Sequence, residues 1–185
     1  FSAPLASIDA LIVNGRPSND EVTLAFEAGP TNGVSLDGAG GDNSLVVSAA
    51  HADFTVNGSL LAVNFQSINA NAATATEIVI DAPSISAMSP STKMLRVTGG
   101  EGDAVVLQDS GNWLMANPLI DGGRFYRVAV NQVTSEQLQV DNPSSAWRNL
   151  ILPTDVDASG DSTVLDVLLV ITEVGRNEYS DSATG

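Results

Sequence analysis

Seven short runs of alternating apolar residues fill the first part of the chain, up to about residue 83, and they constrain the fold more than any other feature. Each run is rich in β-branched residues and is followed by Gly, Asn or Asp, a pattern typical of strands rather than helices. The runs recur roughly every ten to twelve residues, which fits a sandwich, a barrel or a solenoid with one strand per face. They are residues 10–13, 21–26, 33–36, 44–47, 53–56, 61–65 and 77–80.

The Gly-rich turns between these runs favour a parallel solenoid. Residues 37–45, Asp-Gly-Ala-Gly-Gly-Asp-Asn-Ser-Leu, resemble one nonapeptide of the RTX calcium β-roll. Residues 14–20 occupy the equivalent place one turn earlier, and residues 64–69 have the composition of an inward-facing corner followed by an asparagine turn. We therefore predict a mainly β protein, a right-handed parallel β-solenoid, with a β-sandwich as the alternative. The glycines are interpreted as corners, and calcium at residues 37–42 stays an open possibility.

From Met94 onward the pattern changes to one that we interpret as a cap. Residues 95–107 predict two short strands about a Gly-rich turn, and Gly111-Asn112-Trp113 and two further strand-like runs follow, residues 120–128 and 137–140. This order resembles the tail segment that closes repeat regions in very large exported bacterial proteins. A solenoid needs a unit that hides its open hydrophobic end, so we expect a small antiparallel cap with Trp113 in its core.

Charge and composition restrict the partners that the chain can bind. The 22 acidic residues outnumber the 7 basic ones, a formal net charge of -15, which disfavours nucleic acid and a bare anionic membrane surface as partners. Such a surface suits cation binding or solubility outside the cell. The sequence contains no cysteine and no apolar run long enough to span a bilayer. Because the chain begins at Phe1, in residues that already look like a strand, we expect it to be part of a longer exported protein.

A loop near the carboxyl end has the layout of a calcium site. In residues 155–166, Asp-Val-Asp-Ala-Ser-Gly-Asp-Ser-Thr-Val-Leu-Asp, side-chain oxygens fall at the first, third, fifth and twelfth places, with glycine at the sixth. A hard divalent cation needs six to eight oxygens, and alternate residues of a tight loop can supply them. The apolar run at residues 167–174 predicts a helix directly after the loop.

The segment from Trp147 to Val174 resembles one repeat of a type I dockerin, a module found near the carboxyl end of exported bacterial proteins. The match rests on Trp-Arg-Asn before a proline, the Asp-Val-Asp start, the glycine, the final aspartate and Leu-Leu-Val-Ile. The resemblance implies that Ca²⁺ is bound by side-chain oxygens of Asp155, Asp157 and Ser159, the backbone carbonyl of Asp161 and a bidentate Asp166. Ser159 departs from the usual Asp or Asn and lowers the charge of the site. Ser162 stands where an aliphatic residue is usual, and only one of the two repeats of a dockerin is present.

Signals for catalysis are few in this sequence. His51 is the only histidine, which we interpret as a turn residue, and no nucleophile, zinc or phosphate-loop motif accompanies it. We predict three parts, a β-repeat region (1–93), a capping segment (94–142) and a calcium loop–helix (143–185). The expected function is a non-catalytic, secreted or cell-surface bacterial module, a β-repeat spacer whose calcium element docks to a cohesin-like protein, another surface component or polysaccharide. The alternative is an accessory or catalytic part of a polysaccharide-degrading enzyme, a glycoside hydrolase or a lyase.

Overall fold

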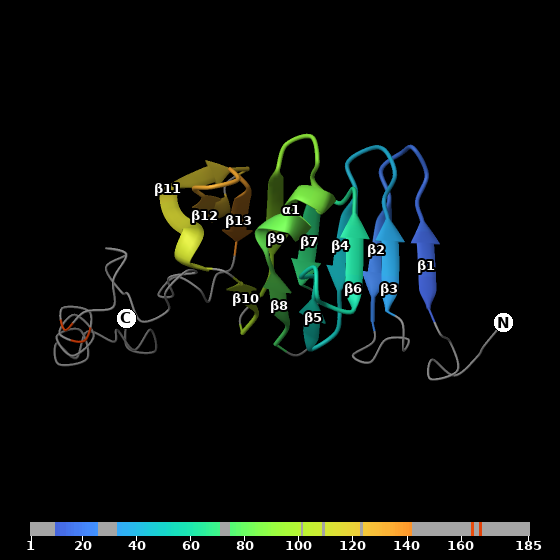
Figure 1. The fold of residues 1–185 in the computed structure, drawn as a ribbon, viewed down its shortest axis with the longest axis horizontal. Coiled ribbons are helices and arrows are strands. Elements are labelled where there is room, and N and C mark those ends of the chain that lie inside the picture. Colours follow the sequence, from blue (N-terminus) through green and yellow to red (C-terminus); the bar gives the residue numbers. More distant parts are fainter. Residues whose placement is uncertain are drawn as a thin grey trace, which may run out of the picture.

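The computed structural model describes residues 10–25, 33–70, 75–100, 102–108, 110–122 and 124–141, together with Val164 and Val167. Within these ranges the chain is a parallel β-solenoid of about 3 turns, followed by antiparallel strands and containing one short helix. The first coil and the antiparallel strands lie at opposite ends of the stack (Figure 1). The predicted parallel solenoid is thus confirmed, and the β-sandwich alternative is wrong, because the ladders between successive coils are parallel.

Three sheets run along the stack, and the second and third coils each contribute one strand to each sheet in turn. Sheet 1 has the order β1-β3-β6, sheet 2 the order β11-β12-β13-β9-β7-β4-β2, and sheet 3 the order β10-β8-β5. The strands of sheet 1 are β1 (Leu11–Asn14), β3 (Val34–Asp37) and β6 (Leu60–Val63). The parallel strands of sheet 2 are β2 (Glu21–Leu24), β4 (Ser44–Val47), β7 (Ser67–Ala70) and β9 (Met94–Thr98), and those of sheet 3 are β5 (His51–Asp53), β8 (Glu77–Ile80) and β10 (Ala104–Leu107).

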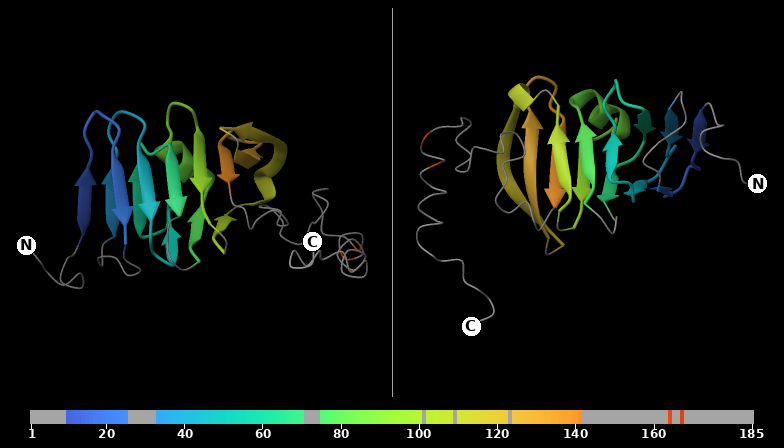
Figure 2. Two further views of the ribbon diagram at one scale, coloured as in Figure 1. Left: turned by 180° about the vertical axis from the view of Figure 1, so that it is seen from behind. Right: turned by 90° about the horizontal axis from the view of Figure 1, so that it is seen from below.

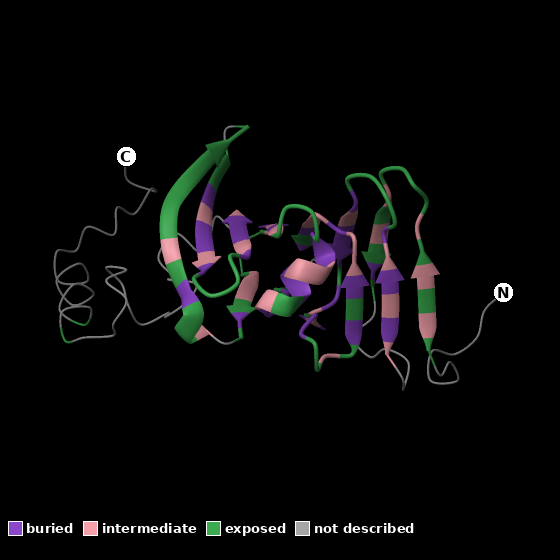
Figure 3. Cartoon of the chain, turned by 45° about the horizontal axis from the view of Figure 1, so that its top comes forward, coloured by how far each residue is buried: buried purple, intermediate pink, exposed green. Residues whose placement is uncertain are grey.

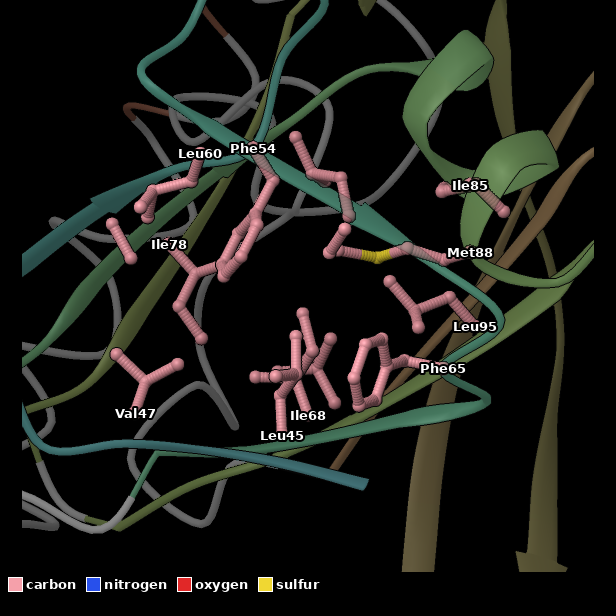
Figure 4. Packing of buried hydrophobic residues seen from close by; sticks show 14 of the residues in the cluster. Leu45, Val47, Phe54, Leu60, Phe65, Ile68, Ile78, Ile85, Met88 and Leu95 are labelled. Carbon is pink, nitrogen blue, oxygen red and sulfur yellow. The ribbon is translucent and has the colours of Figure 1, made fainter. Parts of the chain in front are cut away.

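The register of the parallel strands places apolar residues of successive coils directly above one another, so that aligned apolar side chains fill the interior. Leu45 of β4 pairs with Ile68 of β7, and both are fully buried. Phe54 and Phe65, at corners of the second and third coils, fill the space between the sheets (Figure 4). Each fully buried Leu, Ile or Phe side chain stabilises the fold by roughly 1.5–3 kcal/mol. Figure 3 shows buried residues alternating with intermediate ones along β3, and with exposed or intermediate ones along β6, as expected when only one face of a strand meets the core.

Helix α1 (Ala82–Met88) follows the third coil and contacts β6 and β9, so it lies where a fourth strand of sheet 1 would continue the stack. Asp81 is its N-cap, and the Asp81 carboxylate accepts from the backbone N–H of Ser84 at 2.9 Å. Proline lacks a backbone N–H, and it is tolerated in the first turn because N–H groups there have no helical partner in any case. The buried Ile85 and Met88 turn inward against the core (Figure 4). Helix α1 therefore closes sheet 1 at this end.

The antiparallel cap consists of β11 (Trp113–Asp121), β12 (Arg124–Asn131) and β13 (Gln137–Asp141), with a 3-10 turn, η2 (Ser110–Asn112), before it. β13 pairs in parallel with β9, and the β11–β12 hairpin extends sheet 2 beyond it, as Figure 2 shows from behind. Trp113 is 2% exposed, which confirms its predicted place in the core.

Three local expectations from the sequence are wrong. Ser67–Ala70, interpreted as part of an asparagine turn, forms β7. The strand predicted over residues 53–56 lies earlier, at His51–Asp53, and His51 is a strand residue rather than a turn residue. Helix α1 was not predicted, because its seven residues are too few to show a helical period.

Candidate functional site

The predicted calcium ligands Asp155, Asp157, Ser159, Asp161 and Asp166 all lie outside the residues that the structure describes. Two residues beside them are described: Val164, at the tenth place of the loop, and Val167, directly after its last place. Both are helical, and their side chains are 75% and 57% exposed. The calcium assignment therefore stays a prediction.

The Gly-rich corner at residues 37–43 joins sheet 1 to sheet 2 and lies directly above the corresponding corner of the first coil. Asn14 is in register with Asp37, and the amide N–H of Asp42 donates to Asn19 Oδ1 at 2.9 Å. This stacking confirms the predicted equivalence of residues 14–20 and 37–43. Gly41, at φ +99°, adopts a conformation that residues with a Cβ rarely take.

Asn43 connects three successive coils at this corner and is 1% exposed. Its Nδ2 donates to the carbonyl oxygens of Gly38 at 2.8 Å and Asn64 at 2.9 Å, and its Oδ1 accepts from the backbone N–H of Asp20 at 2.8 Å. Its own N–H donates to Gln66 Oε1 at 2.7 Å, so Asp20, Asn43 and Gln66 form a ladder of equivalent residues, which we call the corner ladder. The ladder pairs backbone groups at a bend where sheet hydrogen bonds are interrupted.

Asp37, the first acid of the RTX-like turn, uses its carboxylate within the corner. Its Oδ1 accepts from Asn64 Nδ2 and from the backbone N–H of Ala39, both at 2.8 Å. The Asn64 hydrogen bond, followed by that from Ala39, lowers the pKa of Asp37 below its ordinary value. Across the described ranges, from residue 10 to residue 141 with their gaps, no three His, Cys, Asp or Glu side chains come together as a metal site.

His51 lies on the outer face of sheet 3 and pairs with Glu77 of the next coil. The distance from His51 Nδ1 to Glu77 Oε1 is 3.0 Å, and both side chains are about half exposed. An exposed pair of this kind contributes less than about 1 kcal/mol to stability. The arrangement is a cross-strand pair on a solvated face.

Glu136 lies buried where the cap meets helix α1, a position that no pattern in the sequence indicates. Its Oε1 accepts from Ser86 Oγ and lies 3.6 Å from Lys93 Nζ, while Oε2 has no hydrogen-bond partner among the described residues. Burial raises the pKa of Glu136, but hydrogen bonds from Ser86 and Thr134 and the charge of Lys93 together outweigh it and hold the pKa below its ordinary value. The carboxylate thus fastens the turn before β13 to the solenoid.

Arg96 on β9 contacts three other strands of sheet 2, namely β11, β12 and β13. Its Nη1 lies 2.9 Å from Asp121 Oδ2, and its Nε and Nη2 donate to Gln139 Oε1 at 3.2 and 3.0 Å. The guanidinium also lies 4.5 Å from the centre of the Tyr126 ring, a cation–π distance. Gln139 and Tyr126 are buried, so Arg96 is a structural clasp whose planar fork is already engaged.

One shallow depression of about 490 Å³ lies on the outer face of sheet 1. Ile12, Ser35 and Leu61, which are in register on adjacent strands, form part of its floor. None of the described residues that line it carries a charge.

No helix in the described part of the chain is long and apolar enough to cross a bilayer. Comparison with protein-family models, with curated proteins and with solved structures finds no match to this chain. What the structure establishes is the β-solenoid fold with its antiparallel strands.

Proposed function

We propose that the chain is a non-catalytic spacer module of an exported or cell-surface protein, with a calcium-ordered loop–helix at residues 155–174 that docks to a partner. The observation that carries the spacer assignment is the corner ladder, which ties three coils together through the side chain of Asn43. Coils fixed in this way hold a constant distance between whatever lies at the two ends of the stack.

The calcium assignment rests on the loop sequence, and it is supported by Val167, directly after the last place of the loop, being helical. In this proposal Asp155, Asp157, Ser159 and Asp166 supply side-chain oxygens, and Asp161 supplies its backbone carbonyl. Calcium then orders the loop and fixes the helix that a cohesin-like protein or another surface component recognises. Outside the cell even a site with a Kd of about 10⁻⁴–10⁻³ M is filled, so the order would be permanent there.

A calcium titration followed by far-UV circular dichroism at 222 nm tests the loop. We expect a saturable gain of helix signal in the original chain and its loss in Asp155→Ala. Asp161→Ala is the matched control within the loop, because a backbone ligand survives loss of the side chain. A second control, Asp42→Ala, changes an acid of the Gly-rich corner and should leave the titration unaltered.

Three results would contradict the calcium assignment. These are a helix signal that does not respond to calcium, a response of Asp155→Ala equal to that of the original chain, and loss of the response in Asp42→Ala alone. The last result would move the site to the corner at residues 37–43.

A further inference from the structure

Two strands of the first coil each have an edge with no neighbouring strand among the described residues. β1 and β2 are the terminal strands of sheets 1 and 2, at the end of the stack opposite the cap (Figure 1). An edge strand presents a row of unpaired N–H and C=O groups, which proteins usually protect with charged residues, proline or a covering segment. The β1 sequence, Leu-Ile-Val-Asn, contains no charge and no proline. This end of the stack is therefore suited to strand pairing.

Hydrogen bonds inside the stack determine which backbone groups of β1 point to the open edge. The N–H of Leu11 donates to the carbonyl oxygen of Gly33 at 3.2 Å. Neighbouring residues of a strand direct their backbone groups to opposite sides, so those of Ile12 and Asn14 point away from β3.

The same reasoning applies to β2. Directly before this strand, the carbonyl oxygen of Asp20 accepts from the N–H of Ser44 at 2.9 Å. By the same alternation the backbone groups of Glu21 and Thr23 point away from β4. Each of the two edges thus offers the N–H and C=O groups of two residues to a partner strand.

These two edges complement each other when a second copy is placed head to head on the first coil. A two-fold axis through the corner at residues 15–20 sets β1 of each copy antiparallel to β2 of the other. Ile12 then lies opposite Thr23 of the second copy. In the same register Asn14 lies opposite Glu21. Both are pairs of the hydrogen-bonded type, in which two opposite residues exchange both N–H···O bonds.

This register also keeps the side chains on matching faces. The four residues that pair are all exposed, so their side chains remain together on the outer face. Three apolar residues between them face inward and are only partly buried at the open end, namely Leu11, Val13 and Val22. The second copy would cover these three side chains, and removal of apolar surface from water favours association.

Charges at this contact have both signs. In the described part of the first coil the charged residues are Arg16, Asp20 and Glu21. Arg16 is exposed and has no side-chain ion pair among the described residues. The two-fold axis brings it towards Asp20 of the second copy. The net charge of -15 opposes association at long range, but at 0.15 M salt it is screened beyond about 8 Å.

We propose that two copies of this chain associate head to head through their first coils, with β1 of each copy paired antiparallel to β2 of the other. The contact is isologous and uses both open edges, so assembly through it closes at two copies. The dimer goes beyond the proposed spacer function and does not depend on calcium binding at residues 155–166. It would place the two caps at its outer ends.

Sedimentation velocity at 0.15 M salt, over protein concentrations from about 1 to 300 µM, tests the association with Ile12→Pro. Proline removes the N–H that points to the second copy but leaves the Leu11 bond to β3, a position in which an edge strand tolerates it. Ile12→Val is the matched control, because it keeps the N–H and the β-branched side chain. We expect a monomer–dimer equilibrium whose Kd is at least about tenfold higher in Ile12→Pro and unchanged in Ile12→Val.

Disulfide formation between introduced cysteines tests the register independently of proline, since the chain has no native cysteine. Asn14→Cys is mixed with Glu21→Cys under mild oxidation. Opposite residues of a hydrogen-bonded pair have Cα atoms about 5.5 Å apart, within the range that a disulfide spans. The control mixes Asn14→Cys with Thr23→Cys, two residues further along β2. We expect the 14–21 disulfide to form at least about tenfold faster than the 14–23 disulfide.

A monomer at every concentration would overturn the proposal, as would a dimer that Ile12→Pro leaves unchanged. Equal rates of disulfide formation in the two mixtures would overturn it too, because the second copy would then lie in another register. Failure of the calcium proposal would alter none of these results.

Discussion

Replacing Asn43 by alanine should weaken the solenoid more than any other single change at its corners. The substitution removes the side chain that donates to Gly38 and Asn64 and accepts from the N–H of Asp20. Two carbonyl oxygens and one N–H then lose their partners in a place that water reaches poorly, because Asn43 itself is 1% exposed. The rest of the fold is unchanged, so the lost free energy of unfolding is that of stacking one coil on the next.

The magnitude follows from those three groups. Each buried polar group left without a partner costs about 1–3 kcal/mol, and groups near the surface recover part of this through water. Taking about 1 kcal/mol for each of the three gives a loss of about 3 kcal/mol in the free energy of unfolding. A domain of ordinary stability has about 5–15 kcal/mol, so the variant should still fold.

Equilibrium unfolding in guanidinium chloride, followed by the fluorescence of Trp113 in a Trp147→Phe background, measures this loss. Asn69→Ala is the matched control, because Asn69 is an exposed asparagine on β7 whose side chain, among the described residues, makes only a 3.4 Å contact with Thr98 Oγ1. We expect less than about 0.5 kcal/mol for the control. A loss for Asn43→Ala below about 1 kcal/mol, or equal to that of Asn69→Ala, would refute the view that the corner ladder holds the coils together.

Asn43→Asp separates hydrogen bonding from shape. The change keeps the size of the side chain but sets a carboxylate oxygen against the carbonyl oxygens of Gly38 and Asn64. Repulsion and burial raise the pKa of the new carboxyl in the folded state, so its destabilising effect is largest at neutral pH and shrinks as the pH falls through that pKa. The measurement is the difference in unfolding free energy from the original chain at pH 7 and at about pH 4. A difference that does not shrink would contradict the hydrogen-bond account.

Two further predictions concern the cap and a corner glycine. Glu136→Gln should lower the free energy of unfolding by about 1 kcal/mol at pH 7, because the charge facing Lys93 is lost. The pKa of Glu136 is held below its ordinary value, so its charge stabilises the fold above the unfolded pKa of about 4.3. The difference in the free energy of unfolding between the original chain and Glu136→Gln should therefore shrink as the pH falls to about 3. A difference independent of pH would contradict this. Gly41→Ala should lower the free energy of unfolding by about 2 kcal/mol or more, since φ is +99° and the new Cβ would lie 2.6 Å from the carbonyl carbon of Ser18. In the control Gly111→Ala the new Cβ meets nothing within 4 Å, so this change should be nearly neutral. Thermal unfolding of both variants measures the difference.

Most strands could be predicted from the sequence because their β-branched residues alternate with polar ones. The parallel arrangement could be predicted because the turns at residues 14–20 and 37–43 repeat at a constant separation, which a sandwich does not need. β7 was missed because Ser67-Ile68-Asn69-Ala70 has one β-branched residue and an asparagine, and its place is decided by pairing with β4 on one side and β9 on the other. Tertiary contacts there override local propensity.

Helix α1 and the burial of Glu136 were not predicted from the sequence, for different reasons. Helix α1 left a signal in Asp81-Ala82-Pro83-Ser84, an N-cap with proline in the first turn, but the helix was too short for its period to show. Glu136 left no signal, because its burial depends on Ser86 and Lys93, far away in the sequence, coming to the same joint. For the candidate calcium loop the sequence pattern is clear, but the predicted ligands lie outside the residues that the structure describes.

The corner ladder also makes length adjustable in fixed steps. Asp20 and Asn43, like Asn43 and Gln66, are 23 residues apart, so duplication of one such stretch would insert a coil whose corner residues meet their neighbours in unchanged register. Each inserted coil would lengthen the stack by about 4.8 Å, the spacing between neighbouring strands. Insertions of another size are absorbed in the loops instead, as between β3 and β6, whose partners Val34 and Leu60 are 26 residues apart. Duplication or loss of whole coils can therefore change the length of the stack in steps of one coil.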